Sequence, residues 1–222
     1  MLEERGHRVI TPVLTGLGED AARLSPSVDL VTHIDDVMRE LTQQNLRDVI
    51  LVGHSYAGMV ISGVAERKRE QLGRLIYLDA FVPEDGESAL DLLPAGIQGM
   101  LREMARTLGD GWRIPASEGL LDLWGLAPGP ARDFVRERLS DFSLHCFEQK
   151  ISMARDLTDL PRTYVAAVAE EYPGRGAFKR FAEAALRQNW EFHELQTGHQ
   201  GQAEAPEAVA SILLANAAET KS

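Results

Sequence analysis

The chain of 222 residues predicts an α/β fold, in which one mostly parallel sheet is flanked by helices. Short apolar runs alternate with segments whose apolar residues recur at helical spacing, and this alternation favours parallel strands joined by helices. Residues 48–52 and 74–79 are apolar almost throughout, as in strands that are covered on both faces. We therefore interpret residues 1–222 as a single domain.

Five runs have the length and composition of strands: residues 7–11, 48–52, 74–79, 163–168 and 190–195. Four segments are predicted helices: residues 29–41, 56–71, 177–188 and 206–218. In the first of these helices Leu30, Ile34 and Val37 fall on one face, which is expected to turn toward the core.

The middle of the chain differs from the rest. From about residue 84 to about residue 160 it contains no convincing strand, and helical pieces at 95–108 and 129–142 are separated by glycine and proline. We interpret residues 84–160 as a helical cap inserted between two strands. The aromatic residues of this cap are candidates for the roof of a pocket, with plain packing as the alternative: Trp112, Trp124, Phe134, Phe142 and Phe147.

Acidic residues outnumber basic ones, since 34 Asp and Glu against 23 Lys and Arg give a formal charge of −11. Such a field repels nucleic acid and anionic lipid surfaces, so neither is an expected partner. No apolar run approaches the ~18 residues of a membrane span, and the charged N-terminus is unlike a signal peptide. Cys146 is the single cysteine, so no internal disulfide can form, and we expect a cytoplasmic location. Nothing in the sequence indicates an oligomeric state.

Residues 53–58 (GHSYAG) join a predicted buried strand to a predicted helix. A serine on such a sharp turn has an exposed hydroxyl, and its neighbours two positions away must be small. Gly53 and Ala57 meet that need, although glycine is the usual residue at the second position. We predict Ser55 as a nucleophile, with an inert loop serine as the alternative, and the backbone N–H of Tyr56 as an oxyanion donor.

A serine hydroxyl needs a base to take its proton, and the chain has six histidines. His199 lies in a loop after the last predicted strand and before the last predicted helix, which makes it the predicted base. His33 lies in a surface-like context, and the side chain of His54 is expected to point away from the nucleophile.

The acid that orients the base has two candidates, both at the ends of predicted strands. Asp79 closes the strand after the serine strand and has apolar neighbours. Glu170 follows the next strand, in the more usual place for a hydrolase acid, but it is paired with Glu171 in a segment that also suits a solvated loop. Both strand ends meet at the edge where a parallel sheet places its active site, so the choice stays open.

Neither a cofactor nor a metal is expected. No cluster of cysteine and histidine has metal-ligand spacing, and no glycine-rich loop matches a dinucleotide or phosphate-binding fingerprint. The chemistry is therefore expected to come from side chains and backbone groups alone.

Five stretches resemble the α/β-hydrolase superfamily, and more narrowly the bacterial esterases related to plant methylesterases and hydroxynitrile lyases. They are TPVLTGLGE (11–19), LSPSVDLVTHIDDV (24–37), LRDVILVGHSYAGMVI (46–61), LIYLDAFVPEDGES (75–88) and TGHQ (197–200). The resemblance implies that Ser55 is the nucleophile and His199 the base. The acid of the plant members falls at Glu170, whereas many bacterial members have aspartate at the position of Asp79.

The chain departs from the family pattern at two places. The family begins with a strand and an H-G loop that supplies a second oxyanion donor, and neither is found ahead of residues 1–10 (MLEERGHRVI). We therefore expect a fold that is N-terminally truncated relative to the family, and one missing oxyanion donor costs about 10²–10³ in rate. Hydroxynitrile lyases rely on a lysine after the histidine, where this chain has Gln200, which disfavours cyanohydrin chemistry.

The predicted function is that of a serine hydrolase that cleaves a small carboxylic ester through an acyl-enzyme intermediate. The alternative is a catalytically impaired protein of the same fold that binds a small apolar ligand, which the missing strand favours. In both cases the expected partner is a small molecule.

Overall fold

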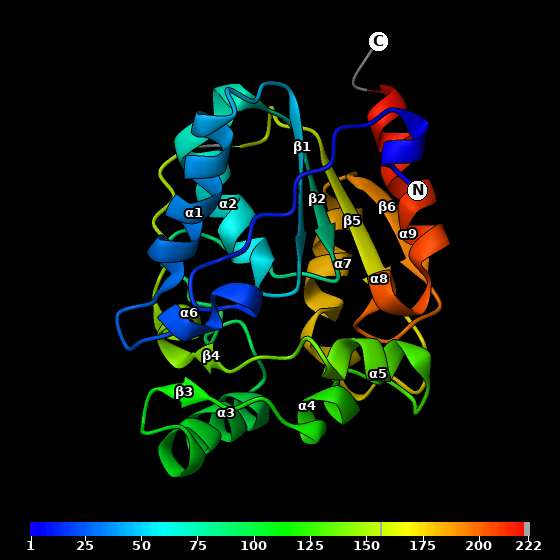
Figure 1. Ribbon diagram of the computed structural model, residues 1–222. Helices are drawn as coiled ribbons and strands as arrows, with labels where there is room; N and C mark the ends of the chain where they lie inside the picture. Colours follow the sequence, from blue (N-terminus) through cyan, green and yellow to red (C-terminus); the bar gives the residue numbers. More distant parts are fainter. Residues whose placement is uncertain (156, 220–222) are drawn as a thin grey trace.

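The computed structural model describes residues 1–155 and 157–219, and its centre is a parallel sheet with the strand order β1-β2-β5-β6 (Figure 1). The strands are β1 (Val49–His54), β2 (Leu72–Leu78), β5 (Arg162–Ala167) and β6 (Glu191–Leu195). All three pairings are parallel, so the carboxyl ends of the four strands share one edge. These four predicted strands are confirmed close to their expected ends.

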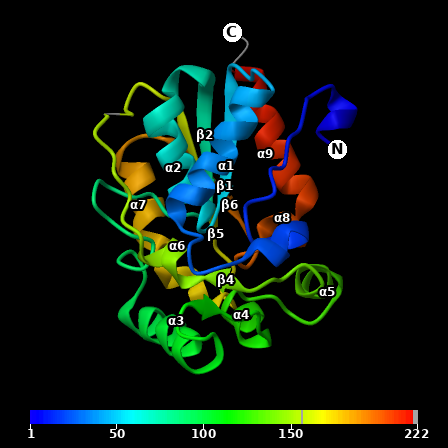
Figure 2. The same ribbon diagram turned by 60° about the vertical axis from the view of Figure 1, so that its left-hand side comes forward.

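Helices cover both faces of this sheet (Figures 1 and 2). On one face α2 (Ala57–Lys68) packs against β1 and β2, and α7 (Lys179–Arg187) packs against β5 and β6. Helix α1 (Leu30–Gln43) lies outside α2, and Asp29 begins it by accepting a hydrogen bond from the Thr32 N–H at 2.9 Å. On the other face α9 (Pro206–Glu219), which follows the short α8 (Gly201–Glu204), closes a second apolar cluster: Ile76, Leu78, Val165, Leu195 and Val209. The four predicted helices are thus confirmed.

The N-terminal segment corrects one expectation, because residues 7–11 form no strand. They follow a short 3-10 helix (Glu3–Arg5), run without a ladder partner, and are followed by a second 3-10 helix (Gly18–Arg23). A groove of about 830 Å³ separates this segment from β1, and residues of both line it. An extended segment becomes a strand only when its N–H and C=O groups pair with a neighbour, and the groove prevents that pairing.

The insertion between β2 and β5 lies beyond the carboxyl ends of the strands (Figure 1). Its helices are α3 (Ala95–Leu108), α4 (Glu118–Leu123), α5 (Pro130–Arg136) and α6 (Leu144–Glu148). It also contains a two-residue antiparallel ladder of β3 (Arg113–Ile114) and β4 (Phe142–Ser143), which corrects the expectation of no strand here. The helix expected over 129–142 ends at Arg136, because the chain then turns toward β4.

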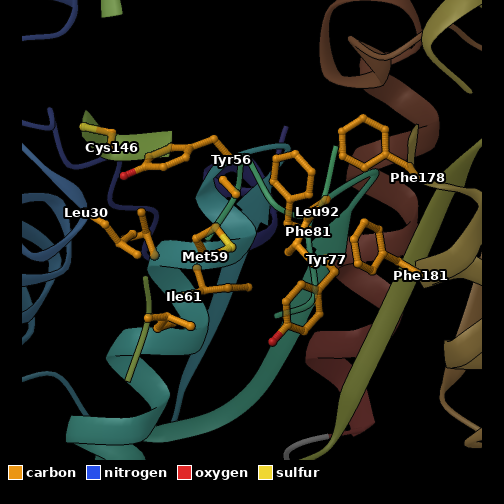
Figure 3. Close-up of a cluster of buried hydrophobic side chains, with 14 of the residues drawn as sticks. Leu30, Tyr56, Met59, Ile61, Tyr77, Phe81, Leu92, Cys146, Phe178 and Phe181 are labelled. Atoms are coloured by element: carbon orange, nitrogen blue, oxygen red, sulfur yellow. The ribbon is translucent and has the colours of Figure 1, made fainter. Parts of the chain in front are cut away.

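Aromatic residues fill the core between α2, α7 and the carboxyl edge of the sheet (Figure 3). Phe81 lies 5.1 Å from Phe178 and 5.8 Å from Phe181 between ring centroids. Tyr56, at the beginning of α2, reaches toward Cys146 of the insertion (Figure 3). This packing joins the insertion to the end of β1, where the candidate site lies.

Candidate active site

Ser55 occupies a sharp turn between β1 and α2 and has a left-handed backbone conformation, with φ of 55°. That conformation is strained for any residue with a side chain, and functional sites are where such strain accumulates. The turn is held by two backbone hydrogen bonds, Ser55 N–H to Leu78 O at 3.3 Å and Phe81 N–H to Ser55 O at 3.2 Å. The serine is therefore fixed between two neighbouring strand ends.

Small residues are required around this turn, as the sequence predicted for Gly53. A Cβ atom on Gly53 would lie 2.7 Å from the carbonyl oxygen of Ala57, and one on Gly58 would lie 2.1 Å from that of Phe81. Both contacts are with backbone atoms, which cannot move without opening the turn. The need at Gly58 escaped sequence reasoning because it arises from the backbone of Phe81, in the segment that follows β2.

Asp79 lies directly after β2 and also has a left-handed backbone conformation, with φ of 41°. Its N–H donates to Val165 O at 2.7 Å, and its Oδ1 accepts a hydrogen bond from the Ala167 N–H at 3.3 Å. The side chain is buried. Two adjacent strands thus end in strained residues whose side chains meet at the same edge of the sheet.

His199 lies in the loop between β6 and α8, and its imidazole lies between the side chains of Ser55 and Asp79. Its Nε2 is 2.7 Å from Ser55 Oγ, and its Nδ1 is 2.7 Å from Asp79 Oδ2. The His199 N–H donates to the Trp124 carbonyl at 2.8 Å, and the ring of Phe178 stacks on the imidazole at 4.7 Å between centroids. Serine, imidazole and carboxylate form one hydrogen-bonded line, an arrangement that can move a proton from the hydroxyl to Nε2.

Glu170 lies away from this line. It follows β5, is exposed like Glu171, and makes no hydrogen bond to His199 among the contacts of the described residues. Between the two carboxylates that the sequence left open, the structure brings Asp79 to the imidazole.

The backbone N–H of Tyr56 donates no hydrogen bond among the backbone contacts of the described residues, so it is free to meet an oxyanion next to Ser55. Its side chain anchors this peptide, because the hydroxyl lies 3.2 Å from His33 Nδ1 and the ring packs 5.0 Å from that of Phe142.

Sequence analysis was wrong to place His33 in a surface-like context. It is buried, its Nε2 is 3.0 Å from the Thr15 carbonyl, and burial lowers its pKa, an effect that the contact with Thr15 partly opposes.

His54 supports the loop that carries the imidazole. Burial lowers the pKa of His54 to about 3, and the nearby His199 adds to the effect, so this ring is neutral. Its Nε2 donates to the His199 carbonyl at 2.7 Å, while its Nδ1 accepts from Gln202 Nε2 at 3.3 Å. Sequence analysis gave His54 no role, and the contact joins residues too far apart in the sequence for spacing to reveal it.

An apolar cavity of about 320 Å³ opens onto Ser55 and His199. Aliphatic and aromatic side chains dominate its lining, and none of the described residues that line it is Asp, Glu, Lys or Arg. Three of the predicted roof residues, Trp124, Phe142 and Phe147, line it. Trp112 and Phe134 do not, and Phe134 is 52% exposed, which corrects their assignment to the roof.

Several known proteins are similar to this chain. The model of the alpha/beta hydrolase family matches residues 1–212. The carbendazim hydrolyzing esterase of Nocardioides sp. (strain SG-4G) is 34% identical over 225 residues, which cover 96% of this chain and 90% of that protein. Methylesterase 1 of Arabidopsis thaliana is 29% identical over 90 residues, 40% of this chain and 34% of that protein.

Solved structures share the fold. An extracellular alpha/beta-hydrolase from a Paenibacillus species superposes with a TM-score of 0.79 at 22% identity, covering 96% of this chain and 88% of that one. A pyrethroid hydrolase from Sphingobium faniae JZ-2 gives a TM-score of 0.72 at 23% identity, with 96% and 87% covered.

The chain belongs to the alpha/beta hydrolase family, with the mostly parallel sheet and flanking helices of that fold. Within the family it is a carboxylesterase-type enzyme, related to the esterases and methylesterases. None of the helices in the described part of the chain is both long enough and apolar enough to cross a membrane.

Proposed function

We propose that the protein hydrolyses small carboxylic esters through an acyl-enzyme formed on Ser55, with His199 as the base and Asp79 as the acid that orients it. The observation that carries this proposal is the pair of 2.7 Å contacts on the two nitrogens of His199. Asp79 accepts a hydrogen bond from Nδ1–H, which keeps that proton on Nδ1 and leaves the Nε2 lone pair facing the serine hydroxyl.

The reaction runs in two halves. Ser55 Oγ attacks the ester carbonyl while its proton passes to His199 Nε2, and the Tyr56 N–H holds the developing oxyanion. The C–O bond to the alcohol then breaks, and His199 returns the proton to the leaving oxygen. Water attacks the acyl-enzyme with His199 again taking the proton, the carboxylic acid departs, and Ser55 recovers its hydrogen.

The cavity supports a neutral, apolar substrate. A volume of about 320 Å³ suits a small molecule, and a lining without charged side chains gives an ionised group on the substrate no partner. The relatives named carbendazim hydrolyzing esterase and methylesterase support an ester as the class of substrate.

Covalent labelling tests this proposal. A p-nitrophenyl dialkyl phosphate releases p-nitrophenol only when it phosphorylates an activated nucleophile, and peptide mass spectrometry locates the label. We expect one label, on Ser55, and none in Ser55→Ala. The control is Ser62→Ala, which removes a buried hydroxyl that is bonded to Tyr77 and should leave labelling unchanged. A folded protein that binds apolar ligands but takes no label at Ser55 would support the ligand-binding alternative instead.

A further inference from the structure

In the loop after β5, the side chain of Tyr172 contacts His199, whereas those of Glu170 and Glu171 do not among the contacts of the described residues. The hydroxyl of Tyr172 lies 3.0 Å from His199 Nδ1, the nitrogen that also contacts Asp79 Oδ2 at 2.7 Å. Its ring is inclined by 24° to the imidazole, with centroids 5.8 Å apart. Tyr172, Asp79 and His199 are all buried, so no bulk water competes for these contacts.

The surroundings are shaped to admit this tyrosine. A Cβ atom on Gly174 would lie 2.7 Å from Tyr172 Cε2 and 3.2 Å from its hydroxyl oxygen. A Cβ atom on Gly125, which belongs to the insertion, would lie 3.1 Å from Tyr172 Cα. Any larger residue at Gly174 would therefore displace the end of the ring that carries the hydroxyl.

The protons in this cluster can be assigned. Nδ1 of His199 must carry a hydrogen if Nε2 is to accept the serine proton, so Nδ1 cannot accept from Tyr172. The phenol O–H is then available to donate a hydrogen bond to the neighbouring carboxylate. Burial raises the pKa of Tyr172, and the charge of Asp79 together with a hydrogen bond to it raises this pKa further, so the phenol stays protonated and donates.

We propose that Tyr172 is a positioning residue that donates a hydrogen bond to Asp79 and thereby fixes the orientation and tautomer of His199. Asp79 already accepts from His199 Nδ1–H at 2.7 Å and from the Ala167 N–H at 3.3 Å, and in this proposal the phenol is its third donor. A hydrogen bond from the phenol partly neutralises the charge of the carboxylate. It therefore weakens the electrostatic attraction between Asp79 and the imidazolium that forms on His199 during the reaction. This inference rests on the proposed roles of His199 and Asp79.

The test is Tyr172→Phe in the full chain, with turnover of a p-nitrophenyl ester measured across pH. We expect kcat to fall about tenfold with KM little changed, because His199 is then held less precisely in the orientation that Ser55 requires. Without the phenol, Asp79 holds the imidazolium more tightly, so the acidic limb of the pH–rate profile should move to higher pH. The low-field proton resonance of the Asp79–His199 hydrogen bond should also shift.

The matched control is Tyr77→Phe, which removes an equally buried hydroxyl bonded to Ser62 at 2.9 Å, away from the site. Gly174→Ala is a second route, because it displaces the end of the Tyr172 ring that carries the hydroxyl without removing that hydroxyl, and it should shift the pH profile in the same direction. A Tyr172→Phe enzyme with the pH profile and proton resonance of the Tyr77 control would overturn the proposal, even if kcat fell. If wild-type turnover did not depend on Ser55, the proposed function would fail instead, and the two failures are distinguishable.

Discussion

The carboxyl edge of the sheet and the helical insertion above it meet at one cavity, yet they are built differently. At the sheet edge the backbone dictates position, since Ser55 and Asp79 both adopt left-handed conformations and backbone hydrogen bonds hold both residues. In the insertion, short helices present apolar side chains whose contribution is volume and shape. From this comparison we expect the sheet edge to determine the rate of the reaction and the insertion to determine which substrates bind.

The largest effect is expected at the sheet edge. Asp79→Asn should lower kcat by about 10⁴, because the amide no longer holds His199 with its proton on Nδ1. Glu170→Gln should leave kcat unchanged, since Glu170 is exposed and has no contact with the imidazole among the described residues. Parallel kinetic assays of the two variants check this, and two similar, mild losses would refute the assignment of the acid.

The sheet edge and the insertion should also differ in how a Gly→Ala substitution changes the free energy of unfolding. Gly58→Ala places a Cβ atom 2.1 Å from the Phe81 carbonyl and should lower the free energy of unfolding by about 1–3 kcal/mol. Gly99→Ala in α3 meets nothing within 4 Å and should raise it by up to about 1 kcal/mol, because alanine is the better helix former. Urea unfolding measures both, and equal effects would contradict the difference between the regions.

Substitutions in the insertion should change selectivity. Ile97 of α3 lines the cavity, so Ile97→Ala should lower kcat/KM for the bulkier apolar esters about tenfold, mainly through KM. Leu108, at the end of the same helix, is 67% exposed, and Leu108→Ala serves as the control. A fall in kcat with KM unchanged would show that the insertion also takes part in the chemistry.

The last prediction concerns the dependence of stability on pH. His54 has a pKa of about 3 when folded against 6.5 as its ordinary value. Between these values the unfolded chain binds a proton that the folded chain does not, so the free energy of unfolding falls as pH falls from 6.5 toward 3. The slope from this one group is at most about 1.4 kcal/mol per pH unit, and above the window it contributes nothing.

His54→Gln should reduce that slope without removing a polar side chain. Urea unfolding of wild type and variant at several pH values gives the difference, in which other acid-sensitive groups cancel. An unchanged slope would mean that His54 is not held neutral in the folded protein.

Sequence reasoning reached the parts of this molecule that local patterns encode. Four strands and four helices follow from apolar periodicity, and Ser55 and His199 follow from their places relative to those elements. The choice between Asp79 and Glu170 could not follow, because it depends on which strand end points its side chain to a loop more than a hundred residues away.

Sequence analysis also missed the burial of His33, for which a signal was present, and the position of Tyr172, for which there was none. The spacing of His33 from Leu30 and Val37 put it on the buried face of α1, a signal that was present in the sequence. Tyr172 gave none, since its role depends on Gly174 and Asp79 together. The segment 7–11 has strand composition, but a strand also needs a partner, and composition does not supply one.

The most direct test of the central claim is turnover of a p-nitrophenyl acyl ester by this chain, with Ser55→Ala as the comparison. The hydrogen-bonded line predicts steady release of p-nitrophenol that is lost in a folded Ser55→Ala protein. Equal turnover by the variant would contradict the role of Ser55, and with it the assignment of this edge of the sheet as the active site.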